Sequence, residues 1–255
     1  MKLTINDNWR FVKQAEDAAK AMQTEGERIS LPHTWNAEDG QDGGNDYYRG
    51  TCWYIKELAE IEKKEEEEVY LEFLGAAMIS DVYLNGKKLF HHEGGYSTFR
   101  VNLTEHLADK NVLAVAVDNG DNTICYPQKA DFTFYGGLYR NVNLLVVPKE
   151  HFALDYCGTP GIKVTPEVDL ETKKATVTVE VWTSGNPTEV TITAAGQTKT
   201  AEVSENYAKA VFEIEQVRLW DGLEDPYLYS TVACLASGDR VSTRFGCRKF
   251  EMDPQ

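Results

Sequence analysis

The stretch Val82-Tyr-Leu-Asn-Gly-Lys-Lys-Leu-Phe90 carries the clearest local fold signal in this 255-residue sequence. Two apolar triplets flank Asn85 and Gly86, and both of these residues tolerate the positive φ angles that a two-residue hairpin turn requires. The stretch therefore predicts an antiparallel β-hairpin with one strand on each side of the Asn-Gly turn.

The same two-residue period recurs along most of the chain. Residues 176–182, Thr-Val-Thr-Val-Glu-Val-Trp, alternate strictly between an apolar and a polar face. Helical periodicity is limited to residues 12–22, with a short turn near residues 104–107. Many short strands separated by turns are typical of β-sandwiches, so the predicted fold class is all-β. Further strands are expected at residues 69–74, 112–117, 142–147, 190–193, 210–214, 228–235 and 241–250.

A domain boundary is expected where this alternation stops, between Pro148 and Lys163. The segment contains Thr159-Pro-Gly161, a turn signature. We assign residues 1–150 to a jelly-roll, galactose-binding-like sandwich. Residues 151–255, with about seven expected strands, fit an immunoglobulin-like β-sandwich.

The composition limits the classes of partner. The net charge is −15, with 41 acidic against 26 basic residues. Such a surface repels phosphate backbones and anionic membranes, so we expect neither nucleic acid nor a membrane as a partner. A neutral ligand such as a sugar is compatible with this charge.

The cysteines and the first residues predict a cytoplasmic protein. Five scattered cysteines form no Cys-x-x-Cys pair, which suits reduced thiols in the cytosol better than a zinc or redox site. The start, Met-Lys-Leu-Thr-Ile-Asn-Asp-Asn, has no apolar signal core, and no apolar run approaches bilayer-spanning length.

The segment between Tyr126 and Val142 is the strongest candidate for a binding site. It places one carboxylate, Asp131, among five aromatic residues and just before the pair Gly136-Gly137. Aromatic faces stack on the C–H face of a sugar ring, and a carboxylate accepts hydrogen bonds from sugar hydroxyls. The alternative interpretation is a packed aromatic corner of a β-domain, because buried aromatic residues mainly form cores. The segment alone does not decide between the two.

Several motifs, taken in order, resemble family 2 glycoside hydrolases, the β-galactosidase and β-glucuronidase group. The resemblance is collinear over nearly the whole chain, which makes it far more specific than a single motif. The segments that carry it are Leu31-Pro-His-Thr-Trp-Asn36, Val82-Tyr-Leu-Asn-Gly-Lys87, Glu93-Gly-Gly-Tyr-Ser-Thr-Phe99, Tyr135-Gly-Gly-Leu-Tyr-Arg-Asn-Val142, Asp225-Pro-Tyr-Leu-Tyr229 and Arg244-Phe-Gly-Cys-Arg-Lys-Phe250.

The resemblance implies that the chemistry lies outside this chain. In that family two glutamates on a (β/α)₈ barrel cleave the glycosidic bond, and the acid/base usually follows an asparagine. No Asn-Glu dipeptide occurs in this sequence, so we expect no catalytic residue here. The chain is interpreted as the non-catalytic N-terminal part of a retaining, β-galactosidase-type enzyme, inactive alone, with its own barrel domain as partner. We also expect the whole enzyme to be a homo-oligomer.

The resemblance also implies two substrate-binding residues. Asp131 stands six residues before Gly137, where β-galactosidases of the family have an aspartate that binds galactose hydroxyls and a sodium ion. Asn45 matches, more loosely, an asparagine of the sugar pocket, with Asp46 or Arg49 as near alternatives and a plain loop residue as another. We therefore expect Asp131 and Asn45 to bind substrate, Asp131 to bind sodium in the whole enzyme, and no other cofactor.

Two alternative functions stay open. One is a fragment of a β-glucuronidase or β-mannosidase; the sequence Ala-Asp-Phe-Thr-Phe-Tyr around Asp131 favours a galactosidase, and basic residues for a uronate carboxylate are not evident. The other is a free-standing carbohydrate-binding or adhesion module, which would bind sugar without a barrel.

Overall fold

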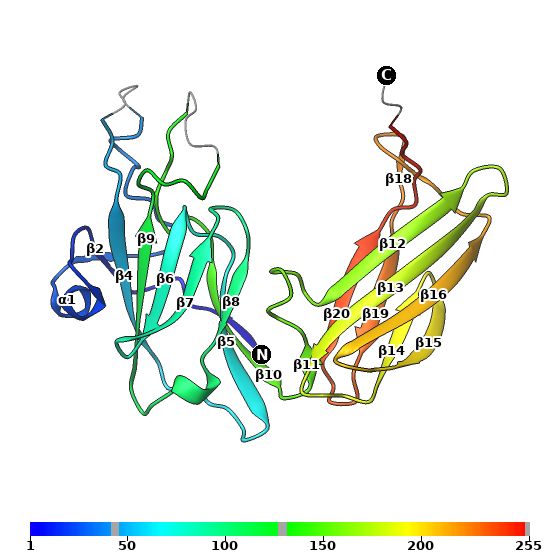
Figure 1. Cartoon of the computed structure of the whole chain (residues 1–255), viewed down its shortest axis with the longest axis horizontal. Helices are drawn as coiled ribbons and strands as arrows, with labels where there is room; N and C mark the ends of the chain where they lie inside the picture. The colour runs from blue at the N-terminus through cyan, green and yellow to red at the C-terminus, as the bar shows by residue number, and fades with distance from the viewer. Residues whose placement is uncertain (42–45, 127–131, 253–255) are drawn as a thin grey trace. The chain divides into compact units, whose positions relative to one another are not determined.

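The computed structural model describes residues 1–41, 46–126 and 132–252 (Figure 1). The chain folds into two compact units, Met1–Val146 and Val147–Gln255. The regular secondary structure of both units is almost wholly β-strand, which confirms the predicted all-β fold class.

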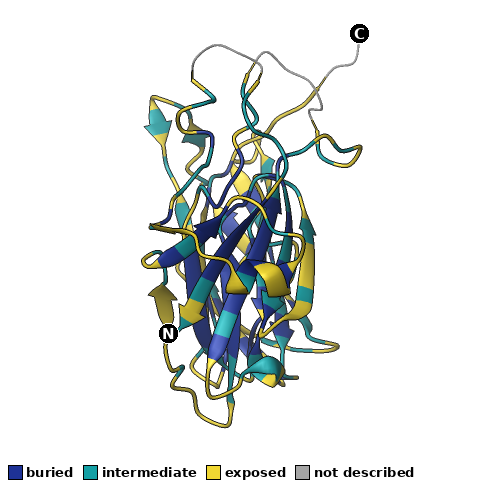
Figure 2. Cartoon of the chain, turned by 90° about the vertical axis from the view of Figure 1, so that its left-hand side faces the viewer, coloured by how far each residue is buried: buried dark blue, intermediate teal, exposed yellow. Residues whose placement is uncertain are grey.

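The first unit is a jelly-roll sandwich of two sheets. Their facing side chains form one apolar core, and Figure 2 shows buried positions along the strands and exposed positions in the loops. The six-stranded sheet has the order β3 (Glu27–Ile29), β2 (Trp9–Val12), β4 (Thr51–Leu58), β9 (Asn111–Asp118), β6 (Ile79–Leu84), β7 (Lys87–Glu93). The four-stranded sheet has the order β1 (Lys2–Thr4), β10 (Val142–Pro148), β5 (Glu67–Phe73), β8 (Phe99–Asn102).

The predicted Asn-Gly hairpin is confirmed. Strands β6 and β7 pair antiparallel around Asn85 and Gly86, whose φ angles are 52° and 82°. Both angles are positive, as the two-residue turn requires. The Asn85 side chain also joins the turn to β9, because its Oδ1 accepts a hydrogen bond from the Val112 backbone N–H at 2.9 Å.

The predicted helix at residues 12–22 is wrong in its first half. Val12 is the last residue of β2 and pairs with Trp53 of β4. The Val12 backbone therefore belongs to the sheet and does not start a helix. The helix α1 spans only Ala18–Gln23, and Asp17 is its N-cap: the Asp17 carboxylate accepts a hydrogen bond from the Lys20 N–H at 2.8 Å. The short turn expected near residues 104–107 forms a 3₁₀ helix, Thr104–His106.

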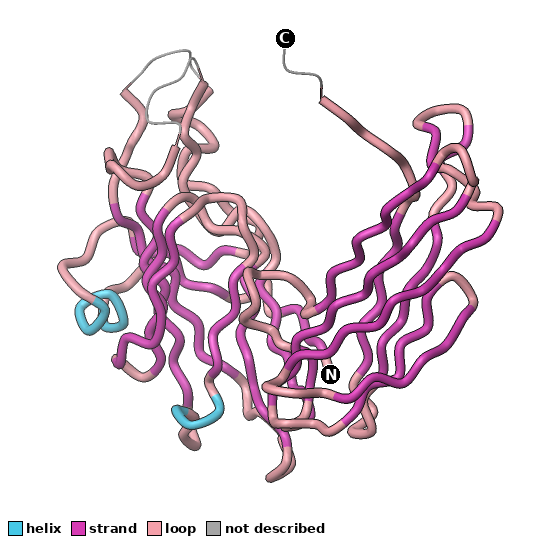
Figure 3. Tube along the Cα trace, turned by 45° about the vertical axis from the view of Figure 1, so that its right-hand side comes forward, coloured by secondary structure: helices cyan, strands magenta, loops and turns pink. Residues whose placement is uncertain are grey.

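The second unit is an immunoglobulin-like sandwich (Figure 3). Strict alternation at residues 176–182 is confirmed, because Val177, Val179 and Val181 point into the core of this unit. In one sheet β13 (Lys174–Ser184) pairs with β12 (Ile162–Asp169), β16 (Tyr207–Glu215) and, at its end, β11 (His151–Phe152). The other has the order β15 (Gln197–Glu202), β14 (Glu189–Ala194), β19 (Tyr229–Cys234), β20 (Arg240–Phe245), and a separate pair joins β17 (Trp220–Asp221) to β18 (Asp225–Pro226).

A buried carboxylate joins the strands of the four-stranded sheet in the first unit. Glu72 on β5 is 4% exposed, and its oxygens accept hydrogen bonds from Arg100 Nε on β8 at 2.8 Å and Lys2 Nζ on β1 at 2.6 Å. Asn143 Nδ2 on β10 adds a third bond at 3.0 Å. Burial alone would raise the pKa of the Glu72 carboxyl, but the bonds and charges of Lys2 and Arg100 outweigh it and hold this pKa below its usual range.

This depressed pKa predicts a specific acid sensitivity of the first unit. Stability from ionised Glu72 is fully present above the ordinary glutamate pKa, about 4.3, and is lost as the pH falls through the folded-state pKa. Glu72→Gln should lower the free energy of unfolding at pH 7 by about 2–4 kcal/mol. The deficit relative to wild type should begin to shrink near pH 4, where the unfolded-state carboxyl takes up its proton, and should vanish only below the lower folded-state pKa.

Urea unfolding between pH 7 and pH 3, followed by tryptophan fluorescence, measures this difference. Glu65→Gln, an exposed glutamate before β5, is the matched control and should leave the pH profile unchanged. A constant deficit of Glu72→Gln across the whole pH range would contradict the ion-pair explanation.

Candidate functional site

The candidate site lies at the end of the first unit where two long connections meet, at the top of this unit in Figure 1. Residues 30–50 connect β3 to β4, and residues 119–141 connect β9 to β10. The two connections are hydrogen-bonded to each other at several points; Thr133 Oγ1, for example, donates to the Gly40 carbonyl at 2.9 Å. The site is thus built from segments that are about 100 residues apart in sequence but adjacent in the fold.

The first connection is anchored by Asn36, whose side chain is fully buried. Its Nδ2 donates to Asp39 Oδ1 at 3.0 Å and to the Tyr48 carbonyl at 2.9 Å. Its Oδ1 accepts hydrogen bonds from the Gly136 N–H at 2.9 Å and from Asn119 Nδ2 at 3.2 Å. Both donor protons and both acceptor positions of the amide are therefore used, which a buried amide requires.

Asn119 completes the network from the other connection and is also fully buried. Besides Asn36, its Nδ2 donates to the Phe134 carbonyl at 2.8 Å, and its Oδ1 accepts from the Gly50 N–H at 2.9 Å. The guanidinium of Arg49 closes the same corner: its Nε donates to the Asn119 carbonyl at 2.9 Å. Two buried amides thus fix the backbone on both sides of the aromatic segment.

The pair Gly136-Gly137 is required by close packing. A Cβ on Gly136 would lie 2.0 Å from the indole ring of Trp35, and one on Gly137 would lie 2.4 Å from the His33 carbonyl oxygen. Gly137 also has a φ angle of +136°, which disfavours any residue with a side chain. The sequence predicted a turn here; the structure adds that the pair lets the aromatic segment lie directly on residues 33–35.

His33 has a structural role. Its Nδ1 lies 2.8 Å from the hydroxyl of Tyr54, which is fully buried. Burial lowers the pKa of the His33 imidazole, with a smaller opposing effect of Glu27, and burial raises the pKa of the Tyr54 phenol. The imidazole is therefore neutral at neutral pH and bonds the phenol inside the unit.

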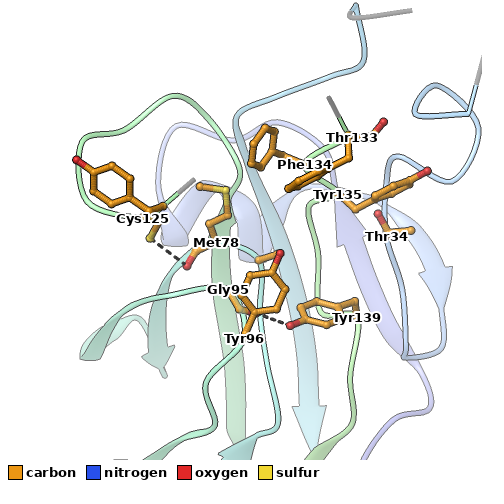
Figure 4. A pocket seen from close by; sticks show the side chains of 12 residues that line it. Thr34, Met78, Gly95, Tyr96, Cys125, Thr133, Phe134, Tyr135 and Tyr139 are labelled. Atoms are coloured by element: carbon orange, nitrogen blue, oxygen red, sulfur yellow. Dashed lines mark hydrogen bonds between the residues drawn. The ribbon is translucent and has the colours of Figure 1, made fainter. Parts of the chain in front are cut away.

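A pocket of about 380 Å³ opens beside this network (Figure 4). In the view of Figure 4, Met78 lies between Cys125 and Phe134, while Tyr96 and Tyr139 lie below them. Half of the twelve lining residues are aromatic. The lining residues are Thr34, Ala77, Met78, Gly95, Tyr96, Cys125, Tyr126, Phe132, Thr133, Phe134, Tyr135 and Tyr139.

The two substrate-binding residues expected from the sequence, Asp131 and Asn45, lie outside the described residues. Their expected roles, including sodium binding by Asp131, stay predictions. Of the near alternatives to Asn45, Asp46 is exposed. Arg49 forms an ion pair, because its Nη1 lies 2.7 Å from Asp121 Oδ1. Within the described ranges, no group of three or more histidine, cysteine or acidic side chains could hold a metal ion.

Several residues of the site were not singled out from the sequence. Met78, Tyr96 and Cys125 come from other segments than the aromatic one, and only folding brings them to the pocket. The buried pair Asn36 and Asn119 gave no local signal either, because Asn36 follows His33-Thr-Trp35 and Asn119 directly follows Asp118.

Both units match domains of one enzyme family. Residues 4–148 match the sugar binding domain of the family 2 glycosyl hydrolases, and residues 160–248 match a second domain of the same family. The chain therefore belongs to family 2 of the glycosyl hydrolases.

Curated relatives and solved structures agree with this assignment. The chain is 31% identical to a β-glucuronidase of Bacteroides fragilis over 99% of its own length, and 28% identical to the β-galactosidase BoGH2A of Bacteroides ovatus over 98%. It is also similar to the structure of β-glucuronidase 2 of Bacteroides uniformis covalently bound to cyclophellitol-6-carboxylate aziridine, with 30% identity and a TM-score of 0.82 over 99% of this chain and 33% of that one. The chain spans 38% and 32% of the lengths of the two curated relatives. Within the part of the chain that the structure covers, no helix has the length and apolar character to cross a membrane.

The amide network predicts a large cost for removing Asn36. Asn36→Ala leaves the Gly136 N–H and one Asn119 proton without their partner in a buried place. The Tyr48 carbonyl then keeps only the longer hydrogen bond from Trp35 Nε1, at 3.3 Å. We expect the free energy of unfolding of the first unit to fall by about 2–4 kcal/mol, measured by urea unfolding.

Asn141→Ala serves as the matched control. Asn141 is exposed and accepts one hydrogen bond, from Asn6 Nδ2 at 3.0 Å, so its loss should cost about 0.5 kcal/mol or less. Equal effects of the two substitutions would show that the buried network does not hold the connections together.

Proposed function

We propose that the whole protein is a retaining β-glycosidase and that the first unit of this chain forms part of the wall of its substrate site. The observation that carries this proposal is the aromatic pocket held by the Asn36–Asn119 network, inside a unit that matches the family's sugar binding domain. Because the chain spans about a third of the relatives' lengths, we place the reacting carboxylates in the remainder of the protein. Covalent binding of an aziridine by the Bacteroides uniformis relative supports the retaining mechanism, in which a carboxylate attacks the sugar.

The sugar is proposed to be a β-glucuronide, with a β-galactoside as the second candidate. The β-glucuronidase name of a 31% identical relative supports the first. The sequence around Asp131 and the similarity to a β-galactosidase support the second. No lining residue of the described pocket is charged, so a uronate carboxylate would be bound by groups elsewhere in the protein.

We propose that Asp131 and Asn45 supply the polar contacts to the sugar, since both flank the described part of the site in sequence. Phe132, which follows Asp131, lines the pocket. A sodium ion on Asp131 is part of the same proposal, and no step of the reaction is derived through it. A cytoplasmic location and a homo-oligomeric whole enzyme are kept as proposals; the five cysteines, all in the described part, form no disulfide and support the first.

Because we place the reacting carboxylates outside this chain, we expect the full-length protein and residues 1–255 alone to differ in activity. The full-length protein should release nitrophenol from p-nitrophenyl β-glucuronide or β-galactoside, while residues 1–255 alone should not, because they lack the two reacting carboxylates. Turnover by residues 1–255 above a heat-killed control, abolished by changing a single glutamate of this chain, would overturn the proposal.

Asp131→Asn in the full-length protein tests the expected sugar contact. A hydrogen bond to a charged group contributes about 1.5–3 kcal/mol, so kcat/KM should fall roughly ten- to a hundredfold. Thermal unfolding should change little, because asparagine keeps the shape of the side chain. If Asp131→Asn lowers the unfolding temperature strongly, while the molecules that stay folded keep full activity, Asp131 is a structural corner residue instead.

The adhesion-module alternative makes the opposite prediction for the isolated chain. Tight sugar binding by residues 1–255 in calorimetry, lost in Asp131→Asn, would favour that alternative. We expect weak or absent binding, because this chain forms only part of the proposed site.

A further inference from the structure

We infer that the described pocket is a subsite for the aglycone, and that it takes a planar aromatic group attached to the sugar. This inference rests on the proposed glycosidase function and names the substrate class of the same site. It assigns the aromatic pocket to the leaving group and leaves the sugar to the contacts proposed for Asp131 and Asn45.

Four of the six hydroxyl groups that line the described pocket already donate a hydrogen bond within the protein. Thr34 Oγ1 donates to the Gly136 carbonyl at 2.7 Å, and Tyr139 Oη donates to the Gly95 carbonyl. The hydroxyls of Thr133 and Tyr135 both donate to the Gly40 carbonyl, at 2.9 and 3.3 Å. A hydroxyl has a single proton to donate, so none of these four can donate to a ligand while its bond persists.

A sugar ring is therefore a poor occupant of this pocket. Its hydroxyls require several donors and acceptors, and leaving them unpaired in a pocket costs free energy. None of the twelve lining residues of the described pocket carries a charge, so a carboxylate or phosphate finds no ion pair there. An uncharged, apolar group loses the least on entering it.

The apolar side chains suit a flat ring in particular. The rings of Phe132 and Phe134 lie 5.2 Å apart, within the range of aromatic contacts. The thioether of Met78 adds a polarizable surface that makes favourable contacts with aromatic rings. A volume of about 380 Å³ lies within the range of pockets that hold small organic ligands.

Two tyrosines of the pocket leave most of their surface exposed among the described residues. Tyr96 is 68% exposed and Tyr126 is 79% exposed, although both line the pocket. The backbone beneath Tyr96 is fixed, because Arg140 donates to the carbonyls of Tyr96 at 3.0 Å and Leu74 at 3.1 Å. A ring bound between these residues would gain contact area at little cost in backbone order.

The test compares substrates that share a sugar and differ in the aglycone. The full-length protein is assayed with the 4-methylumbelliferyl and the methyl β-glycoside of the sugar that it hydrolyses, as wild type, Tyr96→Ala and Tyr126→Ala. Each variant should raise KM for the aryl glycoside roughly three- to tenfold and leave KM for the methyl glycoside within about twofold. Phe90→Ala is the matched control, since Phe90 is an exposed aromatic residue of the same unit that stacks on Phe99 away from the pocket.

A second measurement does not depend on turnover. Free 4-methylumbelliferone, titrated by fluorescence, should bind the wild-type protein and the Phe90→Ala control, and should bind Tyr96→Ala several-fold more weakly. Equal losses for both glycosides would place the sugar in this pocket and overturn the inference, while the glycosidase proposal would stand. Unchanged KM values for both substrates, or 4-methylumbelliferone binding that is unaffected by both tyrosine substitutions, would also overturn it. A protein that hydrolyses no β-glycoside would refute the proposed function, and the titration would still decide the occupant of the pocket.

Discussion

The hydrogen bond between Asn36 and Asn119 is the contact on which the candidate site depends. It joins two connections, each about 20 residues long, that the sheets alone leave unordered relative to each other. The remaining donors and acceptors of the two amides bind backbone groups of the two connections, except for one Asn36 proton, which Asp39 Oδ1 accepts. In a buried place such a network stabilises only when it is complete, so it fixes one arrangement of the loops and penalises the others.

The two sheets of the first unit and the loops at its end have separate tasks. Facing apolar residues and the Glu72 ion-pair network hold the sandwich together. In the loops, the hydroxyls of Thr133, Tyr135 and Thr34 donate to backbone carbonyls of the opposite connection. The exposed surface of the described loop residues includes three large aromatic side chains, Tyr126, Phe132 and Tyr135, which is unusual for loops that only connect strands.

Period-two patterns predicted the fold well because they report which face of a strand is buried. Val177, Val179 and Val181 alternate with polar residues in the sequence and in the core of the second unit. The error at residues 12–22 has a physical cause: alanines and charged residues favour a helix locally, but pairing of Val12 with Trp53 gives that residue to the sheet.

The site was less predictable than the fold. The aromatic segment after Tyr126 was visible as a run of unusual residues, and Phe132, Phe134 and Tyr135 do line the pocket. Met78 and Tyr96 carry no such signal, because an isolated methionine or tyrosine in a β-protein is ordinarily core material. Their place in the pocket follows from the pairing of β6 with β7 and β9, a long-range property that no local pattern contains.

The contact of Gly136 with the Trp35 indole has a consequence for how such a site can diversify. Neither member of the glycine pair has room for a side chain, so we expect no other residue to be tolerated at these two positions. The neighbouring exposed positions, such as Tyr96 and Phe132, carry no comparable steric limit. A combinatorial library that retains the glycine pair and randomises those positions would change the chemical character of the pocket while leaving its backbone scaffold in place.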